Sequence, residues 1–367
     1  MRLMVCAGAT GGGVYPALAV LQALGDEAEA LMWVGSEGGM EADLVSRSGV
    51  EFRAVPAAGV HGVGVGRLPG NLWKLGRGVR AARRLLQEFR PDVLFFTGGF
   101  VAIPTALAGR RIPTVLYVPD IEPGLALKAV ARFADEIALT AEESRAYFSG
   151  PAELTVSGYP TRVELARQDQ IEARKVFGLS PEKDTLLVFG GSKGARSINQ
   201  ALIKALPELL EEMQIVHISG TFTWPEVEAA KADLSAEQKS AYRAFPYLHE
   251  EMSAALAAAD LVVSRAGASI LGEYPAMELP SILAPYPHAW RYQKVNADYL
   301  AERGGALVLR DEELEDRLAA EVLALMRTPE KRAQMKQSLK RLAKPQAAET
   351  IAGLLRRAAE GSEPWSH

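Results

Sequence analysis

The chain has 367 residues, a formal net charge of −4 and a hydrophobic content of 48% against 23% charged residues. This length favours two domains that each bury a core, and the acidic balance argues against a general nucleic-acid-binding protein. The single cysteine, Cys6, excludes an internal disulfide and a cysteine-based zinc cluster, and we expect it to be a small buried residue. No apolar run of 18 residues and no signal-peptide pattern occurs, so we expect a cytoplasmic protein, at most peripheral to a membrane.

The first expected strand, residues 3–6, is followed by a turn with four glycines, Gly8, Gly11, Gly12 and Gly13, and then by a helical pattern. Such a turn lets backbone amides approach a pyrophosphate, as in dinucleotide-binding proteins. The spacing differs from G-x-G-x-x-G, and the second expected strand is not closed by an acid, because Glu37 lies beyond it. A nicotinamide dehydrogenase is therefore a poor fit.

Apolar runs alternate with helical patterns along the chain, which is typical of parallel sheets covered on both faces. Further strands are expected at residues 31–34, 93–96, 114–118, 136–139, 185–189, 214–218, 261–263 and 281–285. After a Gly/Pro connection at 156–162, a second glycine turn at 190–196 again follows a strand and precedes a helix. We therefore expect two doubly wound α/β domains that share a crevice.

The expected domains are residues 1–160 and 161–344. Residues 330–359 have a helical pattern that is broken at Lys344-Pro345. This break lets the C-terminal helix, 345–360, pack back on the first domain.

A basic segment lies between residues 67 and 90, where Glu88 is the one acid among seven basic residues. These are Arg67, Lys74, Arg77, Arg80, Arg83, Arg84 and Arg90. Leu68, Leu72, Leu75 and Val79 recur at helical spacing, with Trp73 alongside. The pattern predicts a basic amphipathic helix that binds an anionic membrane surface. The alternative is a surface helix whose leucines face the core.

Five stretches, in order over nearly the whole chain, resemble the MurG family: residues 8–20, 33–45, 98–101, 190–196 and 265–273. That family transfers N-acetylglucosamine from its UDP donor to lipid I, giving lipid II in peptidoglycan synthesis. The resemblance implies a GT-B fold, with a membrane-side acceptor domain followed by a domain that binds UDP-N-acetylglucosamine. It also implies a lipid-linked muramyl acceptor, no metal or other cofactor, and a location on the inner face of the cell membrane.

The donor side is expected at the second glycine turn, where free amides and the Ser192 hydroxyl suit a diphosphate at a helix N-terminus. The alternative is a tight turn that needs glycine for its backbone alone. Glu273 is suited to accept two ribose hydroxyls. The resemblance assigns a wider donor set: Arg162 near the phosphates, Gly191, Ser192, Lys193, Gly194, Leu248 through its backbone at uracil, Arg265, Ser269, Glu273, and Gln293 with Asn296 at the sugar. His217 is expected to be an ordinary strand-end histidine.

The acceptor side is expected at two loops of the first domain: Thr10, Gly11, Gly12, Gly13, and Gly98, Gly99, Phe100. Here the family pattern changes. The family's G-G-T-G-G-H loop ends in a histidine that is a leading candidate for activating the acceptor hydroxyl, and this position is Gly13. The family's H-E-Q-N-G motif is replaced within residues 117–124, and Phe100 stands where a tyrosine is usual.

A sugar hydroxyl that attacks C1 needs a base within hydrogen-bond reach. Asp120 and Glu122 are the acids in the right segment, and we hypothesise that Asp120 takes this role. Alternatively, Asp120 caps the N-terminus of the helix that follows. The altered motifs also leave open a transferase for a different glycolipid acceptor, or a non-catalytic nucleotide-sugar-binding protein.

Overall fold

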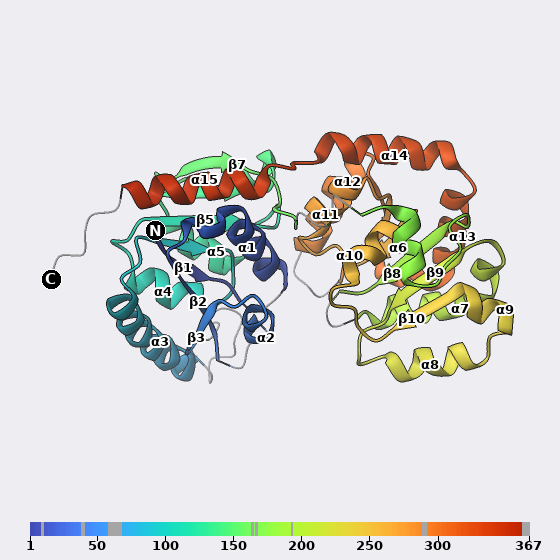
Figure 1. Cartoon of the computed structure of the whole chain (residues 1–367), viewed down its shortest axis with the longest axis horizontal. Helices are drawn as coiled ribbons and strands as arrows, with labels where there is room; N and C mark the ends of the chain where they lie inside the picture. The colour runs from blue at the N-terminus through green and yellow to red at the C-terminus, as the bar shows by residue number, and fades with distance from the viewer. Residues whose placement is uncertain are drawn as a thin grey trace. The chain divides into compact units, whose positions relative to one another are not determined.

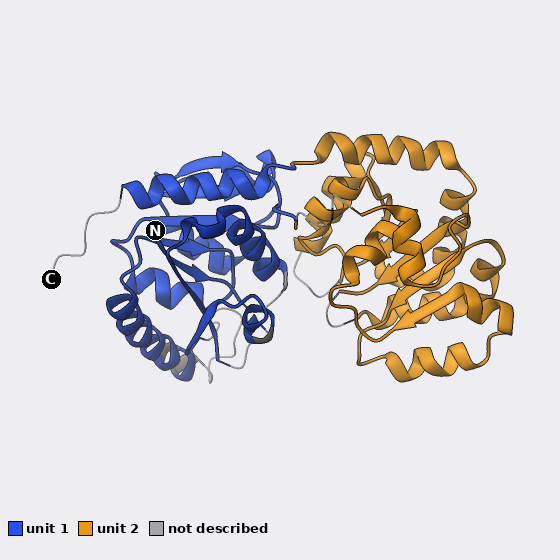
Figure 2. Ribbon diagram, in the orientation of Figure 1, with its two compact units in different colours: residues 1–161, 345–367 blue, residues 162–344 orange. Residues whose placement is uncertain are grey.

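The computed structural model describes residues 1–8, 11–37, 41–57, 68–162, 165, 168–191, 194–287 and 292–361, apart from the side chains of Asp43, Leu68, Pro69 and Leu72. The chain divides into two compact units (Figure 2). Unit 1 comprises Met1–Thr161 and Pro345–His367, and unit 2 comprises Arg162–Lys344. The division falls one residue from the boundary expected from the sequence.

Unit 1 is built on a seven-stranded parallel sheet with strand order β3-β2-β1-β4-β5-β6-β7 (Figure 1). Its strands are β1 (Arg2–Cys6), β2 (Ala30–Ser36), β3 (Glu51–Val55), β4 (Val93–Phe96), β5 (Thr114–Val118), β6 (Glu136–Leu139) and β7 (Glu153–Val156). The helices are α1 (Gly11–Leu24), α2 (Glu41–Ser46), α3 (Leu68–Phe89), α4 (Ala102–Ala108), α5 (Leu125–Val130) and α15 (Ala347–Glu360).

Unit 2 repeats this plan with a six-stranded parallel sheet of order β10-β9-β8-β11-β12-β13. Its strands are β8 (Thr185–Phe189), β9 (Gln214–Ile218), β10 (Tyr242–Phe245), β11 (Leu261–Ser264), β12 (Ser281–Leu283) and β13 (Ala306–Val308). The helices are α6 (Gln170–Val176), α7 (Arg196–Glu212), α8 (Trp224–Ala232), α9 (Ala236–Ala241), α10 (Met252–Ala258), α11 (Ile270–Met277), α12 (Tyr292–Glu302), α13 (Leu314–Met326) and α14 (Pro329–Leu342).

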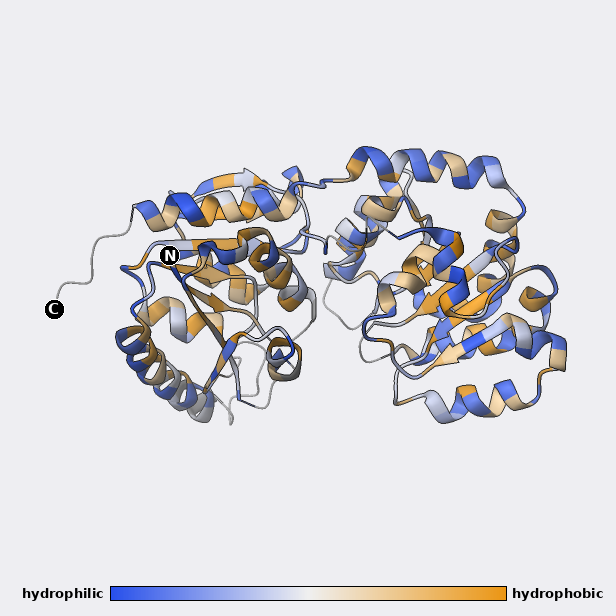
Figure 3. Cartoon of the chain, viewed as in Figure 1, coloured by the Kyte–Doolittle hydropathy of each residue, from blue (hydrophilic) through white to orange (hydrophobic). Residues whose placement is uncertain are grey.

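The cores lie where the apolar strands pack against their helices. All five residues of β5 and of β9 are buried, and Figure 3 shows hydrophobic residues concentrated in the strands of both units. Cys6 is buried in β1, and burial raises the pKa of its thiol to about 12. The predicted role of Cys6 as a small core residue is thus confirmed.

The C-terminal helix returns to unit 1, as the sequence predicted. The chain leaves α14 at Leu342, and α15 then packs against α1 and β5 (Figure 1). Arg356 on α15 forms two hydrogen bonds to the Glu27 carboxylate, at 2.6 and 2.9 Å. Helix packing and an ion pair therefore both join the end of the chain to its beginning.

In each unit the first strand pairs on both sides, so the loops after β1 and after β8 lie at the centre of a row of strand carboxyl ends. In open parallel sheets ligands bind at this edge, where the strand order reverses direction. The glycine turns of the sequence occupy these two positions. The fold therefore directs attention to residues 7–13 in unit 1 and 190–196 in unit 2.

Candidate active site

The turn after β8 needs glycine because the chain comes close to the next strand. Gly191 and Gly194 have positive φ angles of 85° and 76°. A Cβ on Gly194 would lie 2.2 Å from the carbonyl oxygen of Ser219, which follows β9. The turn leads into α7, whose N-terminal backbone amides favour an anion. Ser192 and Lys193, both predicted donor residues, lie outside the described residues.

Two predicted donor residues, Ser269 and Arg162, lie near the carboxylate of a third, Glu273. Glu273 is half-buried in the first turn of α11, and the Ser269 side chain hydrogen-bonds to it. Desolvation raises the pKa of Glu273, while the charge of Arg162 and the Ser269 bond oppose this rise. The result is an acceptor group held in place beside a cation, as a bound ribose and phosphate require.

Arg265, a predicted donor-binding residue, is held by contacts within unit 2. Its guanidinium is nearly buried and donates to Asp311 Oδ1 at 2.5 Å, to Ser197 Oγ at 2.8 Å and to the Ala284 carbonyl at 2.9 Å. Because Ser197 lies in the first turn of α7, Arg265 braces the helix that follows the donor turn. A buried guanidinium needs such partners, and these three bonds satisfy part of its five N–H donors.

Asn296 and Gln293 of α12 likewise bond to the protein. Asn296 is fully buried, and its side-chain amide donates to the Ala266 carbonyl at 3.2 Å. This bond supports the turn after β11, and the predicted contact of Asn296 with the sugar stays a prediction. Gln293 is half-buried, and its side-chain carbonyl accepts a 2.9 Å bond from the Tyr286 amide.

Leu248 lies where a backbone contact to a base was expected, in the loop after β10. It is half-buried, two residues beyond Pro246 in the same loop. Since β10, β9 and β8 are neighbours in the sheet, the loops after them lie in sequence along one edge. The arrangement gives a row from Leu248 through Ser219 to Gly194.

In unit 1 the two predicted acceptor loops are in contact. Thr97 Oγ1 donates to the carbonyl of Gly13 at 2.7 Å, and a Cβ on Gly99 would lie 2.9 Å from the Gly8 carbonyl oxygen. Gly98 and Gly99 have φ angles of 144° and 86°, and the Phe100 side chain is 49% exposed. Gly11, Gly12 and Gly13 begin α1, while Thr10 lies outside the described residues.

The two candidate bases have different surroundings. Glu122 is buried, with Lys128 Nζ 3.8 Å from its carboxylate, whereas Asp120 is only half-buried. The segment that leads to Asp120 is fixed by the neighbouring strand β6, because Thr140 Oγ1, just after β6, donates to the Val118 carbonyl at 2.9 Å. Beside the larger effect of burial, the charge of Asp120 helps to raise the pKa of Tyr117. Asp120 is thus the more accessible acid of the pair.

The alternative role of Asp120 as a helix cap is wrong. The helix that follows, α5, begins at Leu125, and its N-cap is Gly124, with no capping side chain. Asp120 therefore lies too far along the chain for its carboxylate to accept hydrogen bonds from the first backbone amides of α5. Asp120 thus lies at the carboxyl end of β5, before and apart from the start of α5.

Comparison with known proteins decides the family. Residues 3–139 match the model of the glycosyltransferase family 28 N-terminal domain, and residues 185–351 match that of its C-terminal domain. A relative from Roseiflexus sp. (strain RS-1), a "UDP-N-acetylglucosamine--N-acetylmuramyl-(pentapeptide) pyrophosphoryl-undecaprenol N-acetylglucosamine transferase", is 40% identical and covers 97% of this chain and 94% of its own. A relative of the same name from Desulforudis audaxviator is 38% identical, covering 98% and 99%. The chain belongs to the MurG family of glycosyltransferases.

A solved structure agrees with the MurG fold. The crystal structure of Acinetobacter baumannii MurG superposes with a TM-score of 0.75 at 24% identity, covering 97% of this chain and 99% of that one. The two Rossmann-like units of this chain are thus the two halves of the GT-B fold. The expected fold and the resemblance to MurG are both confirmed.

Gly13 stands where the MurG pattern has a histidine, and the structure shows how the glycine is packed. A Cβ at position 13 would lie 3.1 Å from the carbonyl oxygen of Thr97, closer than ordinary contact. The start of α1 therefore lies tightly against the loop after β4. A larger side chain at this position requires that loop to move.

Glu41 was not among the predicted site residues, although it lies in one of the MurG-like stretches. Glu41 is fully buried and its carboxylate accepts bonds from the Ser36 amide at 2.7 Å and hydroxyl at 2.5 Å. A Cβ on Gly8 would lie 2.5 Å from Glu41 Oε1, so this carboxylate lies directly against the first glycine turn. An acid that follows a strand by a few residues was the signal available in the sequence.

Helix α3 separates its basic and buried faces. Trp73, Arg77, Arg80 and Arg84 are exposed at spacings of three or four residues, and the Arg77 guanidinium lies 4.8 Å from the centre of the Trp73 ring. The buried face carries Ala82, Leu86 and Phe89, and Figure 3 shows the hydrophilic residues along the other side of the helix. Lys74 is exposed too, whereas Arg67 and the Leu72 side chain lie outside the description.

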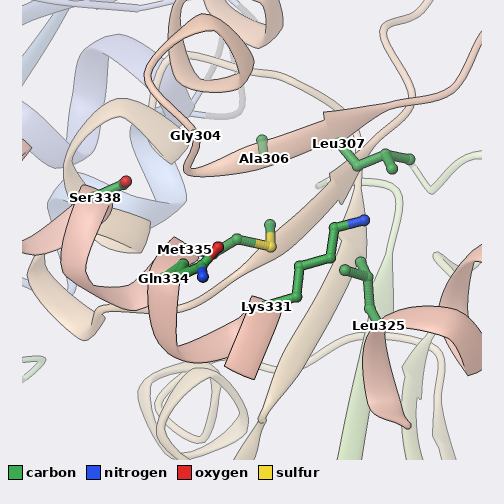
Figure 4. Close-up of a pocket in the computed structure, with 8 residues that line it drawn as sticks. All are labelled: Gly304, Ala306, Leu307, Leu325, Lys331, Gln334, Met335 and Ser338. Atoms are coloured by element: carbon green, nitrogen blue, oxygen red, sulfur yellow. The ribbon is translucent and has the colours of Figure 1, made fainter. Parts of the chain in front are cut away.

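A pocket of about 410 Å³ lies elsewhere in unit 2, between the edge strand β13 and helices α13 and α14. In Figure 4, Lys331 and Met335 extend from α14 toward Ala306 and Leu307 on β13. None of the predicted donor residues lines it. Among the described residues, no three His, Cys, Asp or Glu side chains gather as metal ligands would, and no helix is long and apolar enough to span a bilayer.

Proposed function

We propose that this chain transfers N-acetylglucosamine from UDP-N-acetylglucosamine to undecaprenyl-pyrophosphoryl-N-acetylmuramyl-pentapeptide, or lipid I, giving lipid II. The reaction inverts the anomeric centre. The observation that carries the proposal is the group formed by Glu273, Ser269 and Arg162 at the carboxyl edge of a MurG-family donor unit. The full-length relatives carry the name of this reaction.

On the donor side, the ribose hydroxyls donate to the Glu273 carboxylate, and Arg162 neutralises the diphosphate. The turn at 190–194 and the N-terminus of α7 offer amides where the charge of the departing UDP increases. Stabilisation at that point lowers the transition state more than the bound substrate. We therefore propose that the transfer needs no metal or cofactor.

On the acceptor side, Asp120 takes the proton of the acceptor hydroxyl as the oxygen attacks C1 and the bond from C1 to the diphosphate breaks. Asp120 is half-buried at the carboxyl end of β5, where it is not used as a helix cap. A carboxylate in such a position acts as a general base when substrate binding excludes water. Glu122 is buried beside Lys128 and supports the segment instead.

Helix α3 brings the enzyme to its lipid-linked substrate. Its face of Trp73, Arg77, Arg80 and Arg84 suits the interface of an anionic bilayer, with the ring at headgroup level and the guanidiniums on phosphates. We accordingly place the protein in the cytoplasm, peripherally on the inner face of the cell membrane.

The deciding experiment incubates the purified chain with labelled UDP-N-acetylglucosamine and lipid I, and measures label in the lipid phase. Transfer to lipid I is the expected result. Transfer only with a native lipid extract would instead indicate a different glycolipid acceptor, which the changes at Gly13 and 117–124 favour. Binding of UDP-N-acetylglucosamine with no product in either mixture would indicate a non-catalytic binding protein.

A further inference from the structure

A continuous chain of buried hydrogen bonds connects β10, β9 and α7 beneath the donor turn. The Tyr242 hydroxyl lies 2.7 Å from His217 Nδ1, and His217 Nε2 lies 3.0 Å from Asn199 Oδ1. The Asn199 amide nitrogen then bonds to the Ser219 carbonyl at 2.8 Å and to Thr223 Oγ1 at 2.5 Å. All five residues are at most 4% exposed. The network is therefore isolated from solvent and does not itself contact a ligand.

The donors in this network all point the same way. Asn199 uses its NH2 group on Ser219 and Thr223, so its Oδ1 must accept, and His217 Nε2 must carry a hydrogen. In a neutral ring Nδ1 then accepts from the Tyr242 hydroxyl. Burial lowers the pKa of His217 to about 3, which keeps the ring neutral. Thr223 Oγ1 also donates to the Ser219 carbonyl, at 2.9 Å, so two donors converge on that oxygen.

The Ser219 carbonyl is also the surface on which the donor turn rests. A Cβ on Gly194 would lie 2.2 Å from this oxygen, so the Gly194 backbone is in close contact with it. Asn199 lies in the first turn of α7, where its backbone amide donates to the Ala195 carbonyl at 3.0 Å. The Asn199 side chain thus connects the helix after the turn to the strand end against which the turn packs.

We propose that His217 and Asn199 are positioning residues that hold Gly194 and the start of α7 in the geometry that binds the diphosphate of a nucleotide sugar. The inference rests on the proposed donor site and adds to it. A site that stabilises charge works only while its donors stay within about 0.5 Å of the productive geometry. Shifting the Ser219 carbonyl moves the support of Gly194 and therefore the amides of the turn.

Gln214 provides a matched control on the same strand. It lies at the amino end of β9, is 2% exposed, and bonds to the Ser180 amide and carbonyl, the Lys183 carbonyl and Thr185 Oγ1 at 2.7–3.0 Å. Replacing Gln214 removes four side-chain hydrogen bonds, whereas replacing His217 removes two. It does so at the edge of the sheet opposite the donor turn.

The test compares UDP with uridine, because the difference between their affinities reports the diphosphate contacts. Calorimetry or NMR titration of the full chain measures both. For His217→Phe we expect UDP to bind about 10-fold more weakly while uridine binding stays within twofold. His217→Gln keeps UDP binding within about threefold, since its amide can donate to Asn199 and accept from Tyr242. Gln214→Met lowers the melting temperature and leaves the UDP-to-uridine ratio unchanged.

Asn199→Asp gives a second variant if His217→Phe does not fold. It is nearly isosteric and places an oxygen against the Ser219 carbonyl, so we expect it too to weaken UDP binding and spare uridine. An unchanged UDP-to-uridine ratio in these variants would overturn the positioning role. If the wild-type chain bound no UDP, the proposed donor function itself would be wrong.

Discussion

The two glycine turns have similar sequences but rest on different groups. In unit 1, Gly8 lies against the buried carboxylate of Glu41. In unit 2, Gly194 lies against the uncharged carbonyl of Ser219, with α7 beginning just beyond. The second turn therefore offers the amides at the start of α7 beside an uncharged oxygen, whereas the first turn lies against an acidic side chain. The same strand-turn-helix pattern thus has different surroundings in the two units, which fits the proposed binding of the donor diphosphate in unit 2 and of the acceptor in unit 1.

The largest effect is expected when the proposed base of unit 1 is removed, which tests whether the two units have separate acceptor and donor roles. For Asp120→Asn we expect kcat to fall by about 10²–10⁴-fold with UDP binding unchanged, because the amide cannot accept the hydroxyl proton. Steady-state transfer to lipid I and UDP titration measure the two effects. Glu122→Gln is the control, expected to alter stability more than kcat. Full turnover by Asp120→Asn would refute the assignment.

A backbone change in the donor turn should abolish tight UDP binding. Gly194→Ala puts a Cβ 2.2 Å from a backbone oxygen at a φ of 76°, so the turn must move and we expect UDP affinity to fall by about 100-fold. Gly191→Ala is the matched variant. It has a φ of 85° but no heavy atom within 4 Å of its Cβ, so strain alone of about 1–2 kcal/mol predicts a smaller loss, measured by calorimetry. Equal effects of the two variants would contradict the packing argument.

Glu273→Gln should separate binding from stability. Loss of charged hydrogen bonds to the ribose predicts about 10–100-fold weaker UDP binding. In the wild type, UDP affinity should fall as pH falls through the raised pKa of Glu273, because protonation removes an acceptor, and the variant should lack this dependence.

Although Glu273→Gln should weaken UDP binding, it should raise the stability of the ligand-free protein. An acid whose folded pKa is raised destabilises the fold as pH rises through that value, so Glu273→Gln should melt at a higher temperature than the wild type at pH 7. Calorimetric melts from pH 4 to 8 measure this. Glu278→Gln at the C-cap of the same helix, where the carboxylate forms a surface ion pair with Lys340, is expected to alter neither property appreciably. A lower melting temperature for Glu273→Gln would contradict the desolvation argument.

The smallest effect is expected at the membrane face. Replacing Arg77 or Arg80 by alanine should weaken binding to vesicles with anionic lipid by about fivefold each, since a basic residue near such a surface contributes about 1 kcal/mol. Co-sedimentation at two salt concentrations measures this. Lys204→Ala in unit 2 removes the same charge from α7 and should have no effect. Vesicle binding that did not depend on anionic lipid content or on salt concentration would contradict the proposed role of this face of α3 in membrane binding.

The sequence alone determined the interior of both sheets and the family. Every strand buried on both sides was expected from its apolar run, and the strands that were missed, β3, β7, β10 and β13, are the edges of the two sheets. The strands β3, β7 and β10 each contain a charged residue that interrupts the apolar run on which the prediction depends, and β13 is apolar but only three residues long. Motif spacing likewise led to the prediction of Glu273 and Asp120 as site residues, because strand ends and turns are local features.

Only the tertiary structure showed which polar residues bond to other parts of the protein and so hold the turns in place. Arg265 and Asn296 match donor-binding positions in sequence, yet their side chains bond within the protein. His217 was expected to be an ordinary buried histidine, and its partners Asn199 and Tyr242 come from other elements. A buried polar group needs a hydrogen-bond partner, and here the partners lie far apart in the sequence. No local sequence pattern indicates which partner is used.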